Sequence, residues 1–223
     1  MVQDPRTRRG IDENTMQMQY PKTWAYLKRF EVVLRQRAAF KRYFTRSAQE
    51  KVKETGTFYS MFNVGEYTFS PYKVVWREQS SSFICSVVEN IEKIVLPDHK
   101  LMLVPFSNRK EAYYLLSVLC SAPVRLAIES YSIATSTNTH VLDNIRIIKF
   151  DPSNAVMEKL CIEGIEVCSD PKTEVSEHEE RIDLLAAQLF EISENELKEI
   201  RWNLKDLQAG GRQKAKHSLF QEL

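Results

Sequence analysis

The stretch FYSMFNVGEYTFSPYKVVWRE, residues 58–78, decides the fold that we expect for this chain. It holds seven aromatic side chains, and its end, YKVVWRE, alternates like a half-buried strand. Aromatic residues at this density usually serve packing, because a strand in a mixed core needs large apolar side chains. We therefore predict a core strand, with its apolar members inward and Lys73 or Arg77 at its edges.

The β pattern extends from this stretch to about residue 106, where Val, Ile, Phe and Tyr stay frequent. A last strand follows a polar loop further along the chain. The predicted strands are YTF at 67–69, YKVVW at 72–76, SSSFICSVV at 80–88, KIVLP at 93–97, KLMLVPF at 100–106 and IRIIKF at 145–150.

Helical patterns precede and interrupt this β region. Residues 20–44 repeat apolar side chains at intervals of three and four, and Pro21 suits a first helical position. This predicted helix is strongly basic. A second helix begins after Asn108, which can cap it, and Pro123 interrupts that helix before a further piece that ends near Tyr131.

From residue 153 onward the chain is expected to be helical. One helix covers 183–192, and the next opens with a capping box of Ser193 and Glu196 and stops at the Gly210-Gly211 pair. The predicted fold class is α+β, a mixed β-sheet core with a central helix, an N-terminal basic helix and a C-terminal helical hairpin. We expect three segments, 1–56, 57–152 and 153–223.

Composition limits the classes of protein that fit. The 223 residues are 43% hydrophobic and 27% charged, which is typical of a globular chain. No stretch reaches the roughly 18 to 20 apolar residues of a membrane span, and the N-terminus is charged, so we expect no membrane partner and a cytoplasmic location. The four cysteines form no C-x-x-C pair, which favours buried reduced thiols over a metal site.

Charge is distributed unevenly although the net charge is only +1. Residues 1–60 carry 13 Lys and Arg against 6 Asp and Glu, while residues 151–200 carry 4 against 14. Such a chain could meet a polyanion with its basic side only. Two solvated helix faces of opposite sign explain the same counts equally well, so both interpretations stay open here.

The sequence does not match the catalytic motifs of DNA methyltransferases or of magnesium-dependent nucleases. Ser70-Pro71-Tyr72 has one proline where the amino-methyltransferase segment [D/N/S]-P-P-[Y/F/W] needs two, and no G-x-G turn for a methyl donor occurs. Pro97-Asp98 has no E-x-K at the spacing of a magnesium-dependent nuclease, and the four histidines are scattered. We therefore expect no enzymatic activity and no cofactor from this chain itself.

Four phrases, in order along the chain, nevertheless resemble one family. They are NVGEYTFSPYKVVWRE at 63–78, LPDHKLMLVPF at 96–106, EAYYLLSVLCSAPVRLAIESY at 111–131 and STNTHVLDNIRIIKFDPSN at 136–154. Together they look like the C-terminal target-recognition region, of the TaqI-type specificity class, of large adenine-N6 DNA methyltransferases. Those enzymes belong to restriction–modification and phage-defence systems.

The resemblance implies sequence-specific contact with double-stranded DNA. It also implies a partner, the catalytic methyltransferase domain with its N-P-P-Y motif, which is missing here and which would bind S-adenosylmethionine. The alternative is a structural or subunit-interaction module without direct DNA binding, in which the basic helix docks another subunit.

Candidate DNA contacts follow from charge and from loop position. The loop TSTNTH, 135–140, offers hydroxyl and amide groups that can read base edges, unless these groups only cap a turn or a strand end. Basic side chains of the first helix and of the predicted core strand would pair with phosphates. The predicted contacts are Arg29, Arg35, Arg37, Arg42, Lys73, Arg77, Thr135, Thr137, Asn138 and His140.

Overall fold

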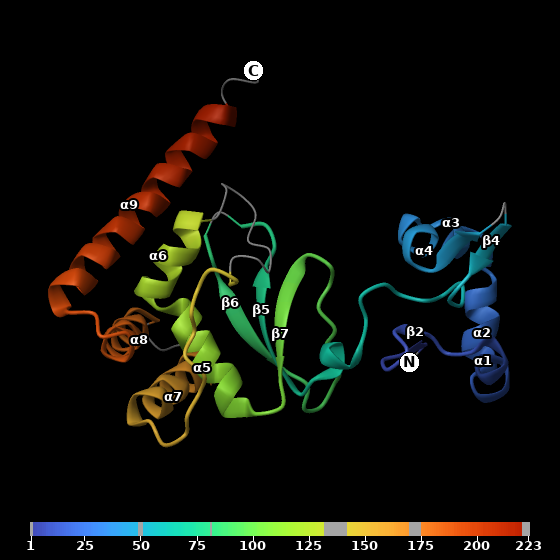
Figure 1. The fold of residues 1–223 in the computed structure, drawn as a ribbon, viewed down its shortest axis with the longest axis horizontal. Coiled ribbons are helices and arrows are strands. Elements are labelled where there is room, and N and C mark those ends of the chain that lie inside the picture. The colour runs from blue at the N-terminus through green and yellow to red at the C-terminus, as the bar shows by residue number, and fades with distance from the viewer. Residues whose placement is uncertain (1, 49–50, 81, 132–141, 170–174, 220–223) are drawn as a thin grey trace. The chain divides into compact units, whose positions relative to one another are not determined.

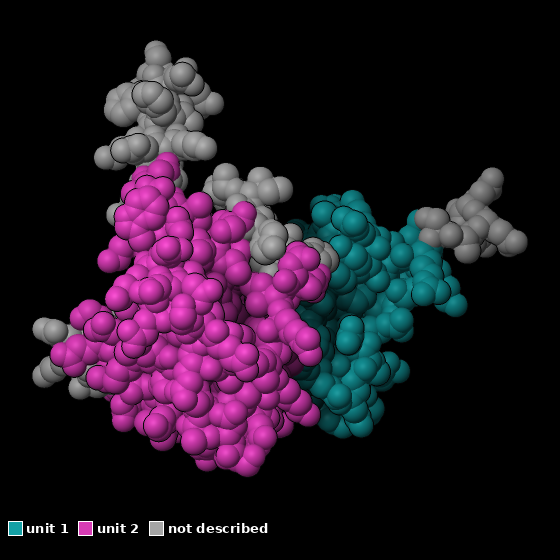
Figure 2. Space-filling view, turned by 60° about the vertical axis from the view of Figure 1, so that its left-hand side comes forward, with its two compact units in different colours: residues 1–69 teal, residues 70–223 magenta. Residues whose placement is uncertain are grey.

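A computed structural model describes residues 2–48, 51–80, 82–131, 142–169 and 175–219 (Figure 1). The chain forms two compact units, residues 1–69 and residues 70–223, drawn in different colours in Figure 2. The sequence placed its boundaries after residues 56 and 152. The structure instead divides after Phe69, directly before the strand on which the second unit is built.

Unit 1 consists of short elements around a small aromatic core. Met16, Phe58 and Tyr59 are buried, and Trp24 packs on both rings with centroid distances of 5.7 and 6.3 Å. Its elements are β1 (Gln3–Asp4), β2 (Arg9–Gly10), α1 (Glu13–Gln19), α2 (Pro21–Lys28), α3 (Glu31–Gln36), α4 (Ala38–Tyr43), β3 (Thr45–Ala48), β4 (Lys51–Glu54) and the 3₁₀ helix η1 (Glu66–Phe69).

The predicted continuous basic helix over 20–44 is wrong. The chain turns tightly at Arg29 and Phe30 and leaves the helical conformation at Arg37, where φ is −54° and ψ is 136°. Residues 67–69 were expected as a strand and lie in the 3₁₀ helix. Residues 47–57 were expected as a loop, yet residues 47–48 lie in strand β3 and residues 51–54 form strand β4.

Unit 2 contains an antiparallel sheet with β5 (Tyr72–Arg77) at its centre, between β6 (Cys85–Glu89) and β7 (Leu101–Phe106). Val74 lies opposite Val87 on one side and Val104 on the other. The aromatic-rich stretch 58–78 thus supplies the central strand. The α+β class is confirmed, and every strand pair in the described residues is antiparallel rather than mixed.

Helix α5 (Arg109–Cys120) is the central helix and lies on the sheet (Figure 1). Eight consecutive residues of it, from Ala112 to Leu119, are buried, because the sheet covers one side and α7 (Ala155–Ser169) covers another. Asn108 caps α5 as predicted. The break before α6 (Ala122–Tyr131) falls at Ser121, with Pro123 in the first turn of α6.

The C-terminal helices are α8 (Val175–Leu189) and α9 (Glu194–Leu219), and α9 runs alongside α6 (Figure 1). Asp183 joins three helices, since its buried carboxylate accepts the Ala122 N–H at 2.6 Å and the Arg201 Nε–H at 2.7 Å. The predicted capping box is confirmed: Glu196 accepts hydrogen bonds from the N–H and the hydroxyl of Ser193.

Three local predictions failed. Residues 145–150 and 93–97 form no strand, and α9 continues through Gly210-Gly211 instead of stopping there. In 145–150, the carbonyl of Ile148 accepts the Tyr114 hydroxyl of α5 at 2.8 Å rather than a neighbouring strand. Within the described parts of the chain, no single helix is both long and apolar enough to cross a membrane.

Candidate nucleic-acid interface

The β3–β4 hairpin carries two cations directly opposite each other. Its register pairs Arg46 with Lys53, and both side chains are exposed. Like charges facing each other across an antiparallel pair destabilise a hairpin. A bound polyanion would remove that repulsion, and a two-stranded ribbon is narrow enough to enter the major groove of B-DNA.

The helix before the hairpin extends this positive surface. Lys41 and Arg42 occupy the exposed last turn of α4, and we refer to Lys41, Arg42, Arg46 and Lys53 as the basic patch. None of the four has a carboxylate within ion-pair distance among the residues that the structure describes. The basic patch is therefore uncompensated within this part of the chain.

An exposed aromatic pair adjoins the basic patch. The guanidinium of Arg42 lies 5.3 Å from the ring centroid of Tyr43, and Tyr43 stacks on Phe62 at 3.4 Å with an interplanar angle of 10°. Tyr43 is 40% exposed and Phe62 is 48% exposed. Exposed rings beside cations can stack on bases or support a phosphate-binding arginine.

Arg35 fixes the hairpin against α3 and is not free for phosphate. It forms ion pairs with Glu31 of its own helix and with Glu54 of β4, the neighbour of Lys53. Hydrogen bonds from Lys28, which has the larger effect, and from Arg35 lower the pKa of the Glu31 carboxyl below its ordinary value. Successive side chains of a strand point to opposite faces, so anchoring Glu54 to α3 leaves Lys53 on the outer face.

Two further predicted contacts have structural roles. Arg37 donates from its guanidinium to the carbonyls of Leu34, Phe58 and Ser60 at 2.8 to 3.0 Å. Lys73 was expected at a strand edge, but its side chain is fully buried and its Nζ donates to the Val95 carbonyl at 3.1 Å. Lys73 is closed off from the surface, and the guanidinium of the half-buried Arg37 is committed to backbone carbonyls instead of phosphates.

The remaining predicted residues divide into exposed and undescribed ones. Arg29, at the end of α2, and Arg77, the last residue of β5, are exposed, and Arg42 belongs to the basic patch. The four loop residues lie outside the residues that the structure describes, so readout by them stays a prediction. They are Thr135, Thr137, Asn138 and His140.

Sequence reasoning missed Arg46 and Lys53, the two residues that define the patch. The available signal was the pair of short segments TRSA at 45–48 and KVKE at 51–54, which are separated by two residues. A two-residue separation between strand-like segments is typical of a hairpin. The lack of glycine or asparagine in the connection hid that signal.

A second polar cluster lies between α7 and α8. Glu163, Glu166 and His178 bring their ligand atoms within 4.8 Å of one another, as a metal site would require. Arg181 already occupies this cluster: its Nε donates to both oxygens of Glu163 at 2.9 and 3.0 Å. The positive charge of this guanidinium would repel a metal cation. We therefore interpret the cluster as an ion-pair network that joins two helices.

Comparison with known proteins finds no matching family model, no matching curated protein and no matching solved structure. Function is therefore inferred from the side chains themselves. Uncompensated, exposed cations on a narrow ribbon can bind phosphates and position a protein on a duplex.

Proposed function

We propose that this chain is the DNA sequence-recognition part of an adenine-N6 DNA methyltransferase of a restriction–modification system. The basic patch of unit 1 would contact the phosphates of double-stranded DNA, in the cytoplasm. A separate catalytic domain would bind S-adenosylmethionine and transfer the methyl group, since this chain lacks both the N-P-P-Y segment and a G-x-G turn.

One observation carries the DNA-binding part of the proposal. Arg46 and Lys53 face each other across β3 and β4, exposed and without a described carboxylate partner. Unit 1 as a whole carries 13 Lys and Arg against 7 Asp and Glu, whereas unit 2 carries 18 against 23. The positive charge is therefore concentrated in the unit that displays the ribbon.

The experiment measures duplex affinity at several salt concentrations. Removing one phosphate contact should reduce the slope of log affinity against log salt by about 0.9. The double variant Arg46→Gln with Lys53→Gln should therefore flatten the slope by about 1.8, if both residues contact phosphates. The matched control is Lys198→Gln with Lys205→Gln, which removes the same charge from exposed positions of α9.

Equal slopes for the two double variants would contradict the proposed role of the patch. A reduced slope in the control alone would place the DNA surface on unit 2. Circular dichroism of each variant checks that the fold is retained.

A docking function is supported by a different surface. The rings of Tyr26 and Phe30 contact each other with centroids 5.2 Å apart, and these two residues and Val33 are 59%, 44% and 64% exposed. Exposed apolar side chains that gather in this way often mark protein contacts. If Phe30→Ser weakened association with the catalytic subunit and left the salt slope unchanged, docking would be the role of this surface.

A further inference from the structure

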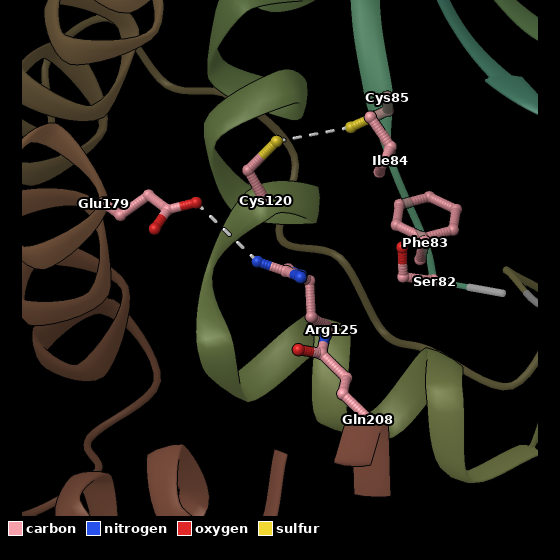
Figure 3. A pocket seen from close by; sticks show the side chains of 8 residues that line it. All are labelled: Ser82, Phe83, Ile84, Cys85, Cys120, Arg125, Glu179 and Gln208. Carbon is pink, nitrogen blue, oxygen red and sulfur yellow. Dashed lines mark hydrogen bonds and ion pairs between the residues drawn. The ribbon is translucent and has the colours of Figure 1, made fainter. Parts of the chain in front are cut away.

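A pocket of about 340 Å³ in unit 2 brings two cysteines together (Figure 3). It lies where β6, the junction of α5 and α6, α8 and α9 meet. Cys85 and Cys120 line it together with Arg125, Glu179 and Gln208. The proposed DNA contact of unit 1 makes no use of this pocket.

The two thiols are in contact. Cys85 is the first residue of β6, Cys120 is the last residue of α5, and their Sγ atoms lie 3.4 Å apart. Neither residue is fully buried, since both face the pocket. A disulfide bond is about 2.05 Å long. The sulfurs therefore need to approach by about 1.4 Å to bond.

The neighbouring arginine is incompletely compensated. Guanidinium nitrogens of Arg125 lie 3.8 Å from Glu179 and 3.9 Å from Glu129, too far for hydrogen bonds. Its Nε is buried and has no hydrogen-bond partner among the described residues. An unsatisfied buried N–H on a cation favours a negative charge nearby, and a thiolate would supply one.

The contact between the sulfurs distinguishes the two cysteines. A hydrogen bond from Cys85 lowers the pKa of the Cys120 thiol, and the charge of Arg125 lowers it further. The same hydrogen bond, together with burial, raises the pKa of the Cys85 thiol. Cys120 is thus the sulfur that loses its proton first, and thiolates are the form that attacks oxidants.

We propose that Cys85 and Cys120 are a modification site, a dithiol that hydrogen peroxide oxidises to a disulfide. The Cys120 thiolate attacks the peroxide oxygen, the O–O bond breaks, and the leaving hydroxide takes a proton to become water. Cys120 is then a sulfenic acid. The Cys85 sulfur attacks that sulfur, the S–O bond breaks, and a second water leaves with the Cys85 proton.

The product would join the edge strand β6 to the junction between α5 and α6. Two thiols and one hydrogen peroxide give one disulfide and two waters, so the peroxide is the only oxidant required. Thiol reductants would reverse the change. The other two cysteines serve as internal references, because Cys161 is buried and Cys168 is exposed at the end of α7.

The experiment treats the full chain with hydrogen peroxide, alkylates the remaining thiols, and maps disulfide-linked peptides without reduction. We expect a Cys85–Cys120 link in the native protein and in the control variant Cys168→Ser. Cys85→Ser should stop at the sulfenic acid, which dimedone traps on Cys120. Cys120→Ser should slow the first oxidation step about tenfold, because it removes the thiolate.

Brief treatment of the chain without substitutions with hydrogen peroxide and dimedone shows the order in which the cysteines are oxidised. This measurement does not depend on the folding of any variant. Cys120 should be labelled before Cys85 and before the exposed Cys168. Oxidation of Cys168 alone, a link from Cys168 to either partner, or no linked peptide at all would overturn the proposal.

Discussion

The guanidinium of Arg37 joins segments of unit 1 that are distant in sequence. Its backbone is extended between α3 and α4, and its side chain donates to the carbonyls of residues 34, 58 and 60. Phe58 lies in the core of the unit, so Arg37 fixes the chain on both sides of that core. Its contribution is to stability.

Arg37→Gln should lower the free energy of unfolding by about 1.5–3 kcal/mol, because the carbonyls lose a charged donor. Arg29→Gln removes the same charge from an exposed position and should change stability by less than about 0.5 kcal/mol. Urea denaturation of both variants tests this. A larger loss for Arg29→Gln would mean that the contacts of Arg37 are not the stabilising ones.

The protonation of Lys73 should make the stability of the fold depend on pH. Burial lowers the pKa of this ammonium below its ordinary value of 10.5. The unfolded state therefore binds the proton more tightly, and stability rises with pH between the lowered pKa and 10.5. At a pH below both values, the folded chain carries the full cost of the buried charge.

Lys73→Met should remove that pH dependence and leave the salt slope of DNA binding unchanged. The measurement is the difference in unfolding free energy between the native chain and the variant from pH 7 to pH 11. Lys149→Met, at an exposed position, is the control. A difference that stayed constant over this range would contradict the assigned burial of the ammonium.

At the scale of elements, α5 and α7 approach each other at a glycine. A Cβ added to Gly164 would lie 2.5 Å from the Ser117 hydroxyl oxygen and 2.7 Å from the Tyr113 carbonyl oxygen. The Ser117 hydroxyl also donates to the Leu160 carbonyl at 2.7 Å across the same contact. The backbone oxygen cannot move aside without disturbing α5.

Gly164→Ala should therefore destabilise unit 2 by about 1–3 kcal/mol through overpacking. Gly210→Ala makes the same change in α9, where nothing lies within 4 Å of the new methyl group. That variant should be more stable by about 0.5–1 kcal/mol, since alanine favours the helix. Thermal unfolding followed by circular dichroism compares them, and shifts of the same sign would refute the argument.

These elements also show what the sequence can predict. The predicted helix caps at Asn108 and at the Ser193–Glu196 box are confirmed, because a cap depends on only a few adjacent residues. Residues 145–150 alternate as a strand should, but pairing depends on which edge is available, and this segment lies beside α5 instead. Lys73 shows the same limit, because its burial depends on a segment some twenty residues away.

The candidate site was less predictable than the fold. Counts of charge located the basic unit correctly, yet they could not distinguish the arginines bound to carboxylates or carbonyls from those exposed to solvent. Glu54, which binds Arg35, lies 19 residues away in the sequence. Only the hairpin register places Arg46 opposite Lys53, and register depends on pairing between strands.

At the scale of the whole molecule, the division of charge coincides with the division into units. Unit 1 has a balance of +6 and a small core, in which Met16, Phe58 and Tyr59 form one buried cluster, whereas unit 2 has a balance of −5 and the larger core around α5. Stability of a unit depends on the apolar area that it buries. Unit 2 therefore contains what it needs to fold alone.

The chain from Ser70 to Leu223, expressed without unit 1, should unfold in one cooperative thermal transition and should not bind duplex DNA at low salt. Its surface is acidic overall, so repulsion by phosphates reinforces the loss of the basic patch. The full chain at the same concentration and salt is the reference. If the shortened chain folded and bound duplex as tightly as the full chain, the DNA surface would lie on unit 2 and the proposed role of the β3–β4 hairpin would be wrong.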